Sequence, residues 1–308
     1  IKDKIHILKY ANPCPALIPL STEPLASAVI RYYGKYLPEA RINLAVNENQ
    51  ASEVSRFLAG YEYSLNIIKI KDNSGVVDTL KDALNKIGPT GRVIINLVTT
   101  IPSSLPELNE VFVSDNLVKS NDWSSLRFCK SDIQFIYKDI KRPQLGHAFT
   151  GIFSTNRKSL IDAIDSLDPS YNNDLLRLVE EVDLSANMQY TKTKWIDCGH
   201  EMNYFKARAE FISSRSFNSI KVDAIKGALI KESDKIDILN DEVNYVNKLP
   251  AELSLYFPRI HKISNMKTTT TVEMEYYGYP SLSEYLLFWN ISRGLWQNIF
   301  NAIKRVLN

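Results

Sequence analysis

Past the middle of the chain the sequence reads Trp195-Ile196-Asp197-Cys198-Gly199-His200, and the fold prediction starts from these residues. An apolar pair followed by an acid, a small residue and a glycine is typical of a strand that ends in a loop. Such strand ends are where α/β proteins place their ligand-binding groups. His200 then begins a predicted helix, whose apolar residues recur at near-helical spacing at Met202, Phe205, Ala209 and Ile212. We therefore expect the functional site to be centred here.

Predicted strands and helices alternate ahead of this stretch. The clearest helical spacing is that of Val77, Leu80, Leu84 and Ile87. A continuous apolar run at 93–97 predicts a strand buried on both faces, and residues 21–24, with a hydroxyl, an acid and a proline, predict a helix start. Further helices are expected at 157–166 and 172–182. The alternation predicts an α/β fold with a Rossmann-like mixed, mainly parallel sheet in a first domain, residues 1–212.

Residues 213–308 show a different pattern. Two predicted strands flank the hairpin signal Lys226-Gly227, and a helix and two more strands follow. Helices are expected at 282–288 and 295–307. This order predicts a separate, small α+β module.

The composition gives no reason to expect nucleic acid or a membrane as a partner. The chain has 308 residues, 44% of them hydrophobic, and a net charge of +2, so it offers no electrostatic argument for binding nucleic acid or anionic membrane. No apolar run has transmembrane length, and we expect no membrane span. The three cysteines have neither metal-ligand nor CxxC spacing, and the N-terminus does not have the pattern of a signal peptide. A cytoplasmic protein is the expectation.

Asp197 is the leading candidate for chemistry. A carboxylate at a strand end beside glycine can hold Mg²⁺, whose preference for oxygen ligands suits phosphate chemistry. The alternative is an Asp that caps the next helix. His200 is a candidate contact to a phosphate or a sugar hydroxyl, against a helix-terminal His bonded to backbone. Arg208 and Arg215 are candidate phosphate clamps, against ordinary solvated arginines.

Two further positions carry hypotheses. Gly151 interrupts the predicted strand 148–153, and glycine in a strand often marks the close approach of a ligand or of another backbone. Lys231 ends an apolar strand, and Glu242 follows on the next predicted helix. A strand Lys with a helix Glu is the nucleotide-positioning pair of kinase folds, and the alternative is a surface lysine with a solvated acid.

Several segments together resemble the sugar-phosphate nucleotidyltransferases. They are residues 15–25 (PALIPLSTEPL), the strand 93–97 running into Thr99-Thr100, Gly151-Ile152-Phe153, and Trp195 to Gly199. The resemblance covers roughly residues 1–212 and implies an enzyme that joins a nucleoside triphosphate to a sugar phosphate with Mg²⁺ and releases pyrophosphate. It gives Asp197, the acid of the W-x-D-x-G motif, the role of metal ligand, and places Gly151 by the sugar.

The resemblance is strongest to forms from bacterial capsule and surface-polysaccharide clusters. In these forms a phosphotransferase similar to choline and aminoglycoside kinases follows, and residues 213–308 resemble its N-lobe. Lys231 and Glu242 are then the nucleotide pair. The chain ends before any catalytic Asp loop, so this module is expected to be inactive as given, and a longer natural chain is expected to carry the kinase C-lobe.

The chain departs from the nucleotidyltransferase pattern in three places. Residues 7–13 (ILKYANP) stand where the family has a Gly-rich G-x-G-x-R loop, and Cys14 stands where it has a lysine. Leu97 to Thr100 carry no acid where the family has a Gly-Asp pair, so a second metal carboxylate is missing.

Two functions of different class follow. One is a divergent nucleotidyltransferase-like enzyme that binds a nucleotide and a sugar phosphate. The other is a protein that has lost catalysis and that binds a nucleotide or a sugar, or scaffolds a partner enzyme.

Overall fold

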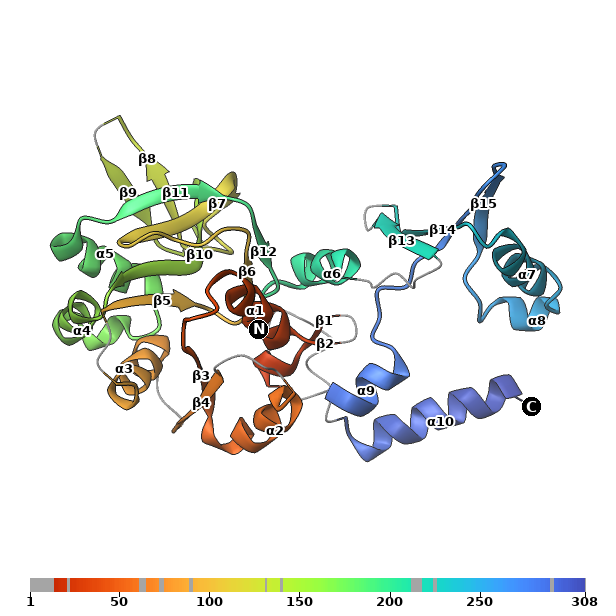
Figure 1. The fold of residues 1–308 in the computed structure, drawn as a ribbon, viewed down its shortest axis with the longest axis horizontal. Helices are drawn as coiled ribbons and strands as arrows, with labels where there is room; N and C mark the ends of the chain where they lie inside the picture. The colour runs from red at the N-terminus through yellow and green to blue at the C-terminus, as the bar shows by residue number, and fades with distance from the viewer. Residues whose placement is uncertain are drawn as a thin grey trace. The chain divides into compact units, whose positions relative to one another are not determined.

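The computed structural model of the protein describes residues 14–20, 23–60, 65–71, 75–88, 91–130, 132–138, 141–211, 218–223, 226–288 and 291–307. The chain forms two compact units (Figure 1). Residues 26–197 make the central unit. Residues 1–25 and 198–308 make the second, which we call the terminal unit.

The central unit is built on a mixed sheet of six strands. Its strands are β5 (Arg92–Asn96), β7 (Glu110–Lys119), β8 (Ser125–Phe128), β9 (Ile133–Ile136), β10 (Leu145–Asn156) and β11 (Gln189–Thr193). The long strand β10 pairs antiparallel with β5, β7 and β8, whereas β11 pairs in parallel with β7. A separate parallel pair joins β3 (Ile42–Asn47) to β4 (Leu65–Ile70). The predicted α/β fold class with a mixed sheet is confirmed.

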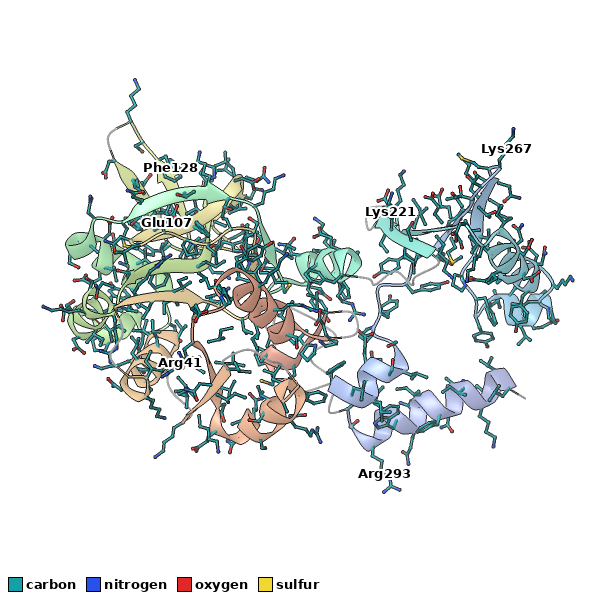
Figure 2. All side chains as sticks on the ribbon, viewed as in Figure 1. Arg41, Glu107, Phe128, Lys221, Lys267 and Arg293 are labelled. Carbon is teal, nitrogen blue, oxygen red and sulfur yellow. The ribbon has the colours of Figure 1, made fainter. Side chains whose placement is uncertain are left out.

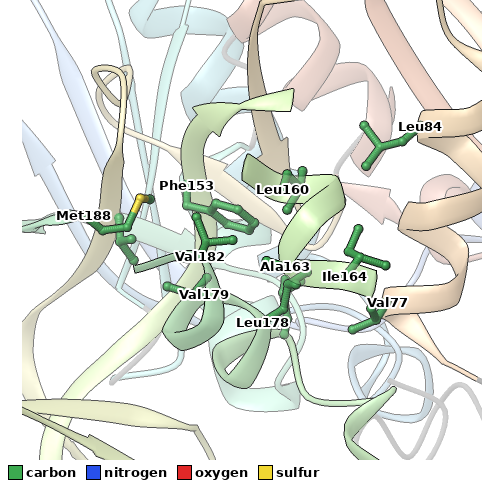
Figure 3. Packing of buried hydrophobic residues seen from close by; sticks show 12 residues of the cluster. Val77, Leu84, Phe153, Leu160, Ala163, Ile164, Leu178, Val179, Val182 and Met188 are labelled. Atoms are coloured by element: carbon green, nitrogen blue, oxygen red, sulfur yellow. The ribbon is translucent and has the colours of Figure 1, made fainter. Parts of the chain in front are cut away.

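Three helices bury their apolar faces against this sheet. They are α3 (Val76–Lys86), α4 (Arg157–Ser166) and α5 (Leu175–Ala186). Figure 3 shows Phe153 of β10 next to Leu160 of α4 and Val182 of α5, all fully buried. Truncation of such a side chain to alanine typically costs about 2–5 kcal/mol, so this cluster fixes the helices on the sheet. Two further helices, α1 (Leu25–Tyr36) and α2 (Glu48–Leu58), precede them in the chain.

The terminal unit contains the predicted strand, strand, helix, strand, strand order. Its sheet has the order β13 (Asn218–Asp223), β14 (Ala228–Ser233), β16 (Thr270–Glu275), β15 (Ile260–Asn265), and the pairs are antiparallel. Helix α7 (Ile236–Asn247) packs on it through Leu239 and Val243, which meet Val272 and Met274. The short α8 (Ala251–Ser254), then α9 (Leu282–Phe288) and α10 (Arg293–Leu307), complete the unit.

One predicted helix start is wrong. Glu23–Pro24 form a short strand, β2, which pairs with β1 (Pro19–Leu20), and helix α1 begins only at Leu25. The backbone amide of Leu25, the first residue of α1, donates to the carbonyl of Ile18 at 2.8 Å. This backbone hydrogen bond takes the place of the expected hydroxyl cap. The first seven described residues therefore fold back on the start of α1.

Other expectations fall outside the described residues. They are the loop at 7–13, Arg215, and the boundary placed between residues 212 and 213. The two-domain division 1–212 and 213–308 stays a prediction. Among the helices that the structure describes, none combines the length and the apolar character needed to cross a membrane.

Candidate functional site

Asp197 lies at the end of a short strand in the central unit. Strand β12 (Trp195–Asp197) pairs antiparallel with β6 (Thr100–Pro102), and the register sets Asp197 opposite Thr100. Both are buried, with exposed fractions of 8% and 2%. The predicted strand end is confirmed, and the chain that follows β5 lies beside this acid.

A hydrogen-bonded turn connects the end of β5 to this pair. The amide of Thr100 donates to the carbonyl of Leu97 at 2.9 Å, and the Thr100 hydroxyl donates to the carbonyl of Thr150 at 3.0 Å. Because Thr150 precedes Gly151 on β10, strands β6, β10 and β12 meet at one place. We call Leu97, Thr100, Gly151 and Asp197 the β5-edge site.

Gly151 has a clear backbone reason to be glycine. Its φ is +80°, a conformation that other residues avoid, and a Cβ atom built there would lie 2.7 Å from Cδ1 of Leu97. Its carbonyl accepts a hydrogen bond from the amide of Leu97 at 3.2 Å, and the register of β10 against β7 shifts between Phe149 and Phe153. The expected close approach of another chain segment is thus present. The sugar-binding role of Gly151 stays a prediction.

The β5-edge site contains one carboxylate, that of Asp197. Within the described ranges, no group of three or more His, Cys, Asp or Glu is placed to hold a metal ion. Mg²⁺ commonly binds through one or two carboxylates together with substrate phosphates and waters. Asp197 therefore fits a magnesium ion that arrives bound to phosphates, whereas these residues do not form a protein-only metal cage.

Helix α6 (Glu201–Glu210) starts where the sequence places it. His200 is the N-cap residue, and its carbonyl accepts the amide of Tyr204 at 2.8 Å. Its side chain does not cap the helix, and its ligand role stays a prediction.

The predicted apolar face of α6 is wrong. Met202 is 70% exposed, and the buried residues of this helix are Tyr204, Ala207 and Arg208. The spacing argument fails because two of these three side chains are polar and are buried through hydrogen bonds and an ion pair.

Arg208 is buried and already has a partner. Its Nη1 lies 2.8 Å from Oε1 of Glu284, and its Nη2 donates to Oε2 at 3.1 Å, a two-point contact. Burial alone would lower the pKa of Arg208, but Tyr204 and Glu284 raise it overall, so the guanidinium stays charged. A solvated surface arginine is excluded. A phosphate clamp would require Arg208 to exchange Glu284 for the phosphate.

Lys231 and Glu242 form the predicted ion pair. Nζ of Lys231 on β14 donates to Oε1 of Glu242 on α7. Their side chains are 20% and 43% exposed, so the pair lies at the surface of the sheet. Figure 2 shows two further lysines of this sheet region extending outward, Lys221 on β13 and Lys267 between β15 and β16. The contact is present, and its role with a nucleotide stays a prediction.

Glu284 is the residue of this region that the sequence argument missed. A signal for it exists, because Ser281-x-x-Glu284 has the spacing of a capping box. Oε2 of Glu284 accepts the amide of Ser281 at 2.6 Å, and the Ser281 hydroxyl accepts the amide of Glu284 at 3.3 Å. The motif predicts a helix start, whereas the contact with Arg208 has no local signal.

No protein-family model matches the chain, and no curated protein does. Solved structures do match. A candidate glucose-1-phosphate thymidylyltransferase from Bacillus anthracis, solved with sucrose, has 19% identity and a TM-score of 0.54, over 68% of this chain and 91% of that chain. HddC from Yersinia pseudotuberculosis has 16% identity and a TM-score of 0.49, over 64% and 90%. The inositol-1-phosphate CTP transferase from T. maritima has 11% identity and a TM-score of 0.46, over 61% and 84%. The first likeness establishes a nucleotidyltransferase-like α/β fold.

Proposed function

We propose that the chain is a divergent sugar-phosphate nucleotidyltransferase-like protein. One observation carries the proposal: Asp197 lies buried at the end of β12, opposite the turn that follows β5, in a chain with a nucleotidyltransferase-like fold. The W-x-D-x-G motif to which Asp197 belongs supports the same assignment. Bacterial capsule or surface-polysaccharide synthesis in the cytoplasm is the proposed setting.

In the proposed reaction, an oxygen of the sugar phosphate attacks the α-phosphorus of a nucleoside triphosphate. A new phosphoanhydride bond forms, the bond between the α- and β-phosphates breaks, and pyrophosphate leaves. A bound Mg²⁺ would supply charge neutralisation to the phosphates. Asp197 would hold this cation. Gly151 would leave room for the sugar, and His200, Arg208 and Arg215 are the proposed contacts to phosphate or sugar hydroxyls.

A second candidate is a binding or scaffolding protein without catalysis. Thr100, rather than an acid, stands opposite Asp197, and Arg208 is paired with Glu284 within the chain. Both observations favour a protein that has kept the fold and has lost the catalytic activity. A nucleotide or a sugar would still bind in this case.

Residues 213–308 form the proposed kinase N-lobe-like module. The Lys231–Glu242 ion pair supports it as the nucleotide-positioning pair. A partner enzyme or a kinase C-lobe is the proposed protein partner. The exposed apolar residues of α10 support a protein contact there, with Phe300 61% and Leu307 79% exposed.

Calorimetric titration separates the two candidates. Each of the common nucleoside triphosphates is titrated with and without Mg²⁺, and pyrophosphate release is followed after a sugar 1-phosphate is added. The enzyme is expected to bind one triphosphate in the presence of Mg²⁺ and to release pyrophosphate. Binding without release favours the second candidate, and no binding of any triphosphate contradicts the enzyme.

A further inference from the structure

The buried Arg208–Glu284 ion pair ties together parts of the terminal unit that are far apart in the sequence. Arg208 belongs to α6 and Glu284 begins α9, 76 positions later. Their side chains are 8% and 9% exposed. A buried charge that loses its partner is strongly destabilising, so this contact holds both helices to one geometry.

The same network reaches the N-terminal segment. The Tyr204 hydroxyl donates to the carbonyl of Pro19 at 2.7 Å, and Nη1 of Arg208 donates to that carbonyl at 3.4 Å. Nη1 also donates to the Tyr204 oxygen at 3.2 Å. The Pro19 carbonyl is therefore held by two side chains of α6, one of which is itself oriented by Glu284.

Segment 14–20 is held by its apolar side chains, and those of Ala16, Leu17, Ile18 and Leu20 are at most 3% exposed. Its one helical turn spans Pro15–Leu17, and its strand, β1, contains two residues. Outside the strand pairing, its backbone hydrogen bonds include those from the amide of Leu17 to the carbonyl of Cys14 at 2.9 Å and from the amide of Leu25 to the carbonyl of Ile18 at 2.8 Å. The hydrogen bonds from Tyr204 and Arg208 to the Pro19 carbonyl add polar contacts to this buried segment.

We propose that Glu284 is a positioning residue that links helix α9 to segment 14–20 through Arg208. A displacement of α9, for example when the C-terminal module binds a ligand, then loosens the Pro19 carbonyl. This segment directly follows residues 7–13, which stand where the proposed function expects the nucleotide loop. The structural link is independent of the proposed function, and only its effect on nucleotide affinity rests on it.

Glu284→Gln tests the link, and Ser281→Ala is its matched control. Gln keeps the shape of the side chain and an acceptor for the Ser281 amide, but it removes the charge that pairs with Arg208. Ser281→Ala weakens the start of α9 and leaves both charges in place. Hydrogen exchange is followed by mass spectrometry in peptides that cover 14–20, α9 and β10.

Glu284→Gln is expected to speed exchange in segment 14–20 by about tenfold or more, with β10 unchanged. Ser281→Ala is expected to speed exchange in α9 only. Equal exchange of segment 14–20 in both variants overturns the proposal, and so does a uniform rise across all peptides, which indicates a purely global effect. Triphosphate affinity is measured in parallel. If wild type binds none, the proposed function fails while the exchange result still decides the link.

Discussion

Asp197, the last residue of β12, pairs with Thr100, the first residue of β6, in an antiparallel ladder. Directly opposite residues of such a ladder lie on the same face of the sheet and within reach of each other. The position that faces Asp197 therefore carries a hydroxyl, which donates a hydrogen bond to the carbonyl of Thr150. Asp197 is thus the one carboxylate of the β5-edge site.

Thr100→Asp should make the stability of the protein depend on Mg²⁺. Two carboxylates opposite each other in a buried place repel, so the variant is expected to lose about 1–3 kcal/mol or more without the metal. Mg²⁺ should restore part of this loss, because it can bind two carboxylates. Thr100→Asn is the uncharged control. Thermal unfolding with and without Mg²⁺ is the measurement, and an equal effect of Mg²⁺ on both variants would show that no cation binds beside Asp197.

Gly151→Ala should destabilise the central unit by about 1–3 kcal/mol, because alanine is strained at positive φ and its Cβ meets Leu97. Adding Leu97→Ala should recover the steric part of the loss, and the backbone strain should remain. Gly60→Ala is the matched control, since a Cβ there meets nothing within 4 Å. Urea unfolding measures all four proteins. Equal stability of the Gly151→Ala and Gly60→Ala variants would contradict the requirement for glycine at position 151.

Lys231→Met should change stability by less than about 1 kcal/mol, because the ion pair with Glu242 is partly exposed. If the pair positions a nucleotide, the same change should abolish triphosphate binding to the C-terminal module. Lys226→Met is the control, because Lys226 forms an exposed pair with Asp223 at 3.5 Å. Calorimetry on both variants is the measurement. Unchanged triphosphate binding by Lys231→Met would show that the ion pair has no role in positioning a nucleotide.

The raised pKa of Tyr204 should contribute to the loss of folding stability in alkaline solution. Burial raises the pKa of Tyr204 to about 12 from the ordinary 10.0, although Arg208 partly opposes this. Because the folded pKa lies above the unfolded one, the stability from this shift is complete below pH about 10 and is lost as the pH rises toward 12. Tyr204→Phe should lose about 1 kcal/mol at neutral pH, with a shallower fall above pH about 10. Unfolding measured from pH 8 to 12 checks this, with the exposed Tyr245→Phe as control, and parallel curves for wild type and Tyr204→Phe would contradict it.

Strongly periodic elements were predictable from the sequence. Helix α4 begins and ends at the predicted residues 157 and 166, and α9 at 282 and 288. The sequence signals for these two helices come from residues that are close together in the chain. The strand end at Asp197 was predictable for the same reason, since an apolar pair, an acid and a glycine fall within five residues.

The buried face of α6 was not predictable in this way. Arg208 is buried because a carboxylate 76 residues away compensates its charge, and no local pattern contains that information. The facing of Asp197 and Thr100 is also a long-range contact. The sequence analysis singled out Asp197 and the acid-free stretch from Leu97 to Thr100 separately, and the structure places Thr100 opposite Asp197.

Titration of Mg²⁺ and a nucleoside triphosphate into wild type and Asp197→Asn tests whether Asp197 holds the cation of a bound nucleotide. Asn keeps the size of the side chain and removes the charge, and Asp165→Asn, at an acid that is 57% exposed and pairs with Lys81, is the control. We expect Mg²⁺-dependent binding by wild type and by the control, and binding weakened by about tenfold or more in Asp197→Asn. Equal affinity of wild type and Asp197→Asn, or no binding of any triphosphate by wild type, would contradict it.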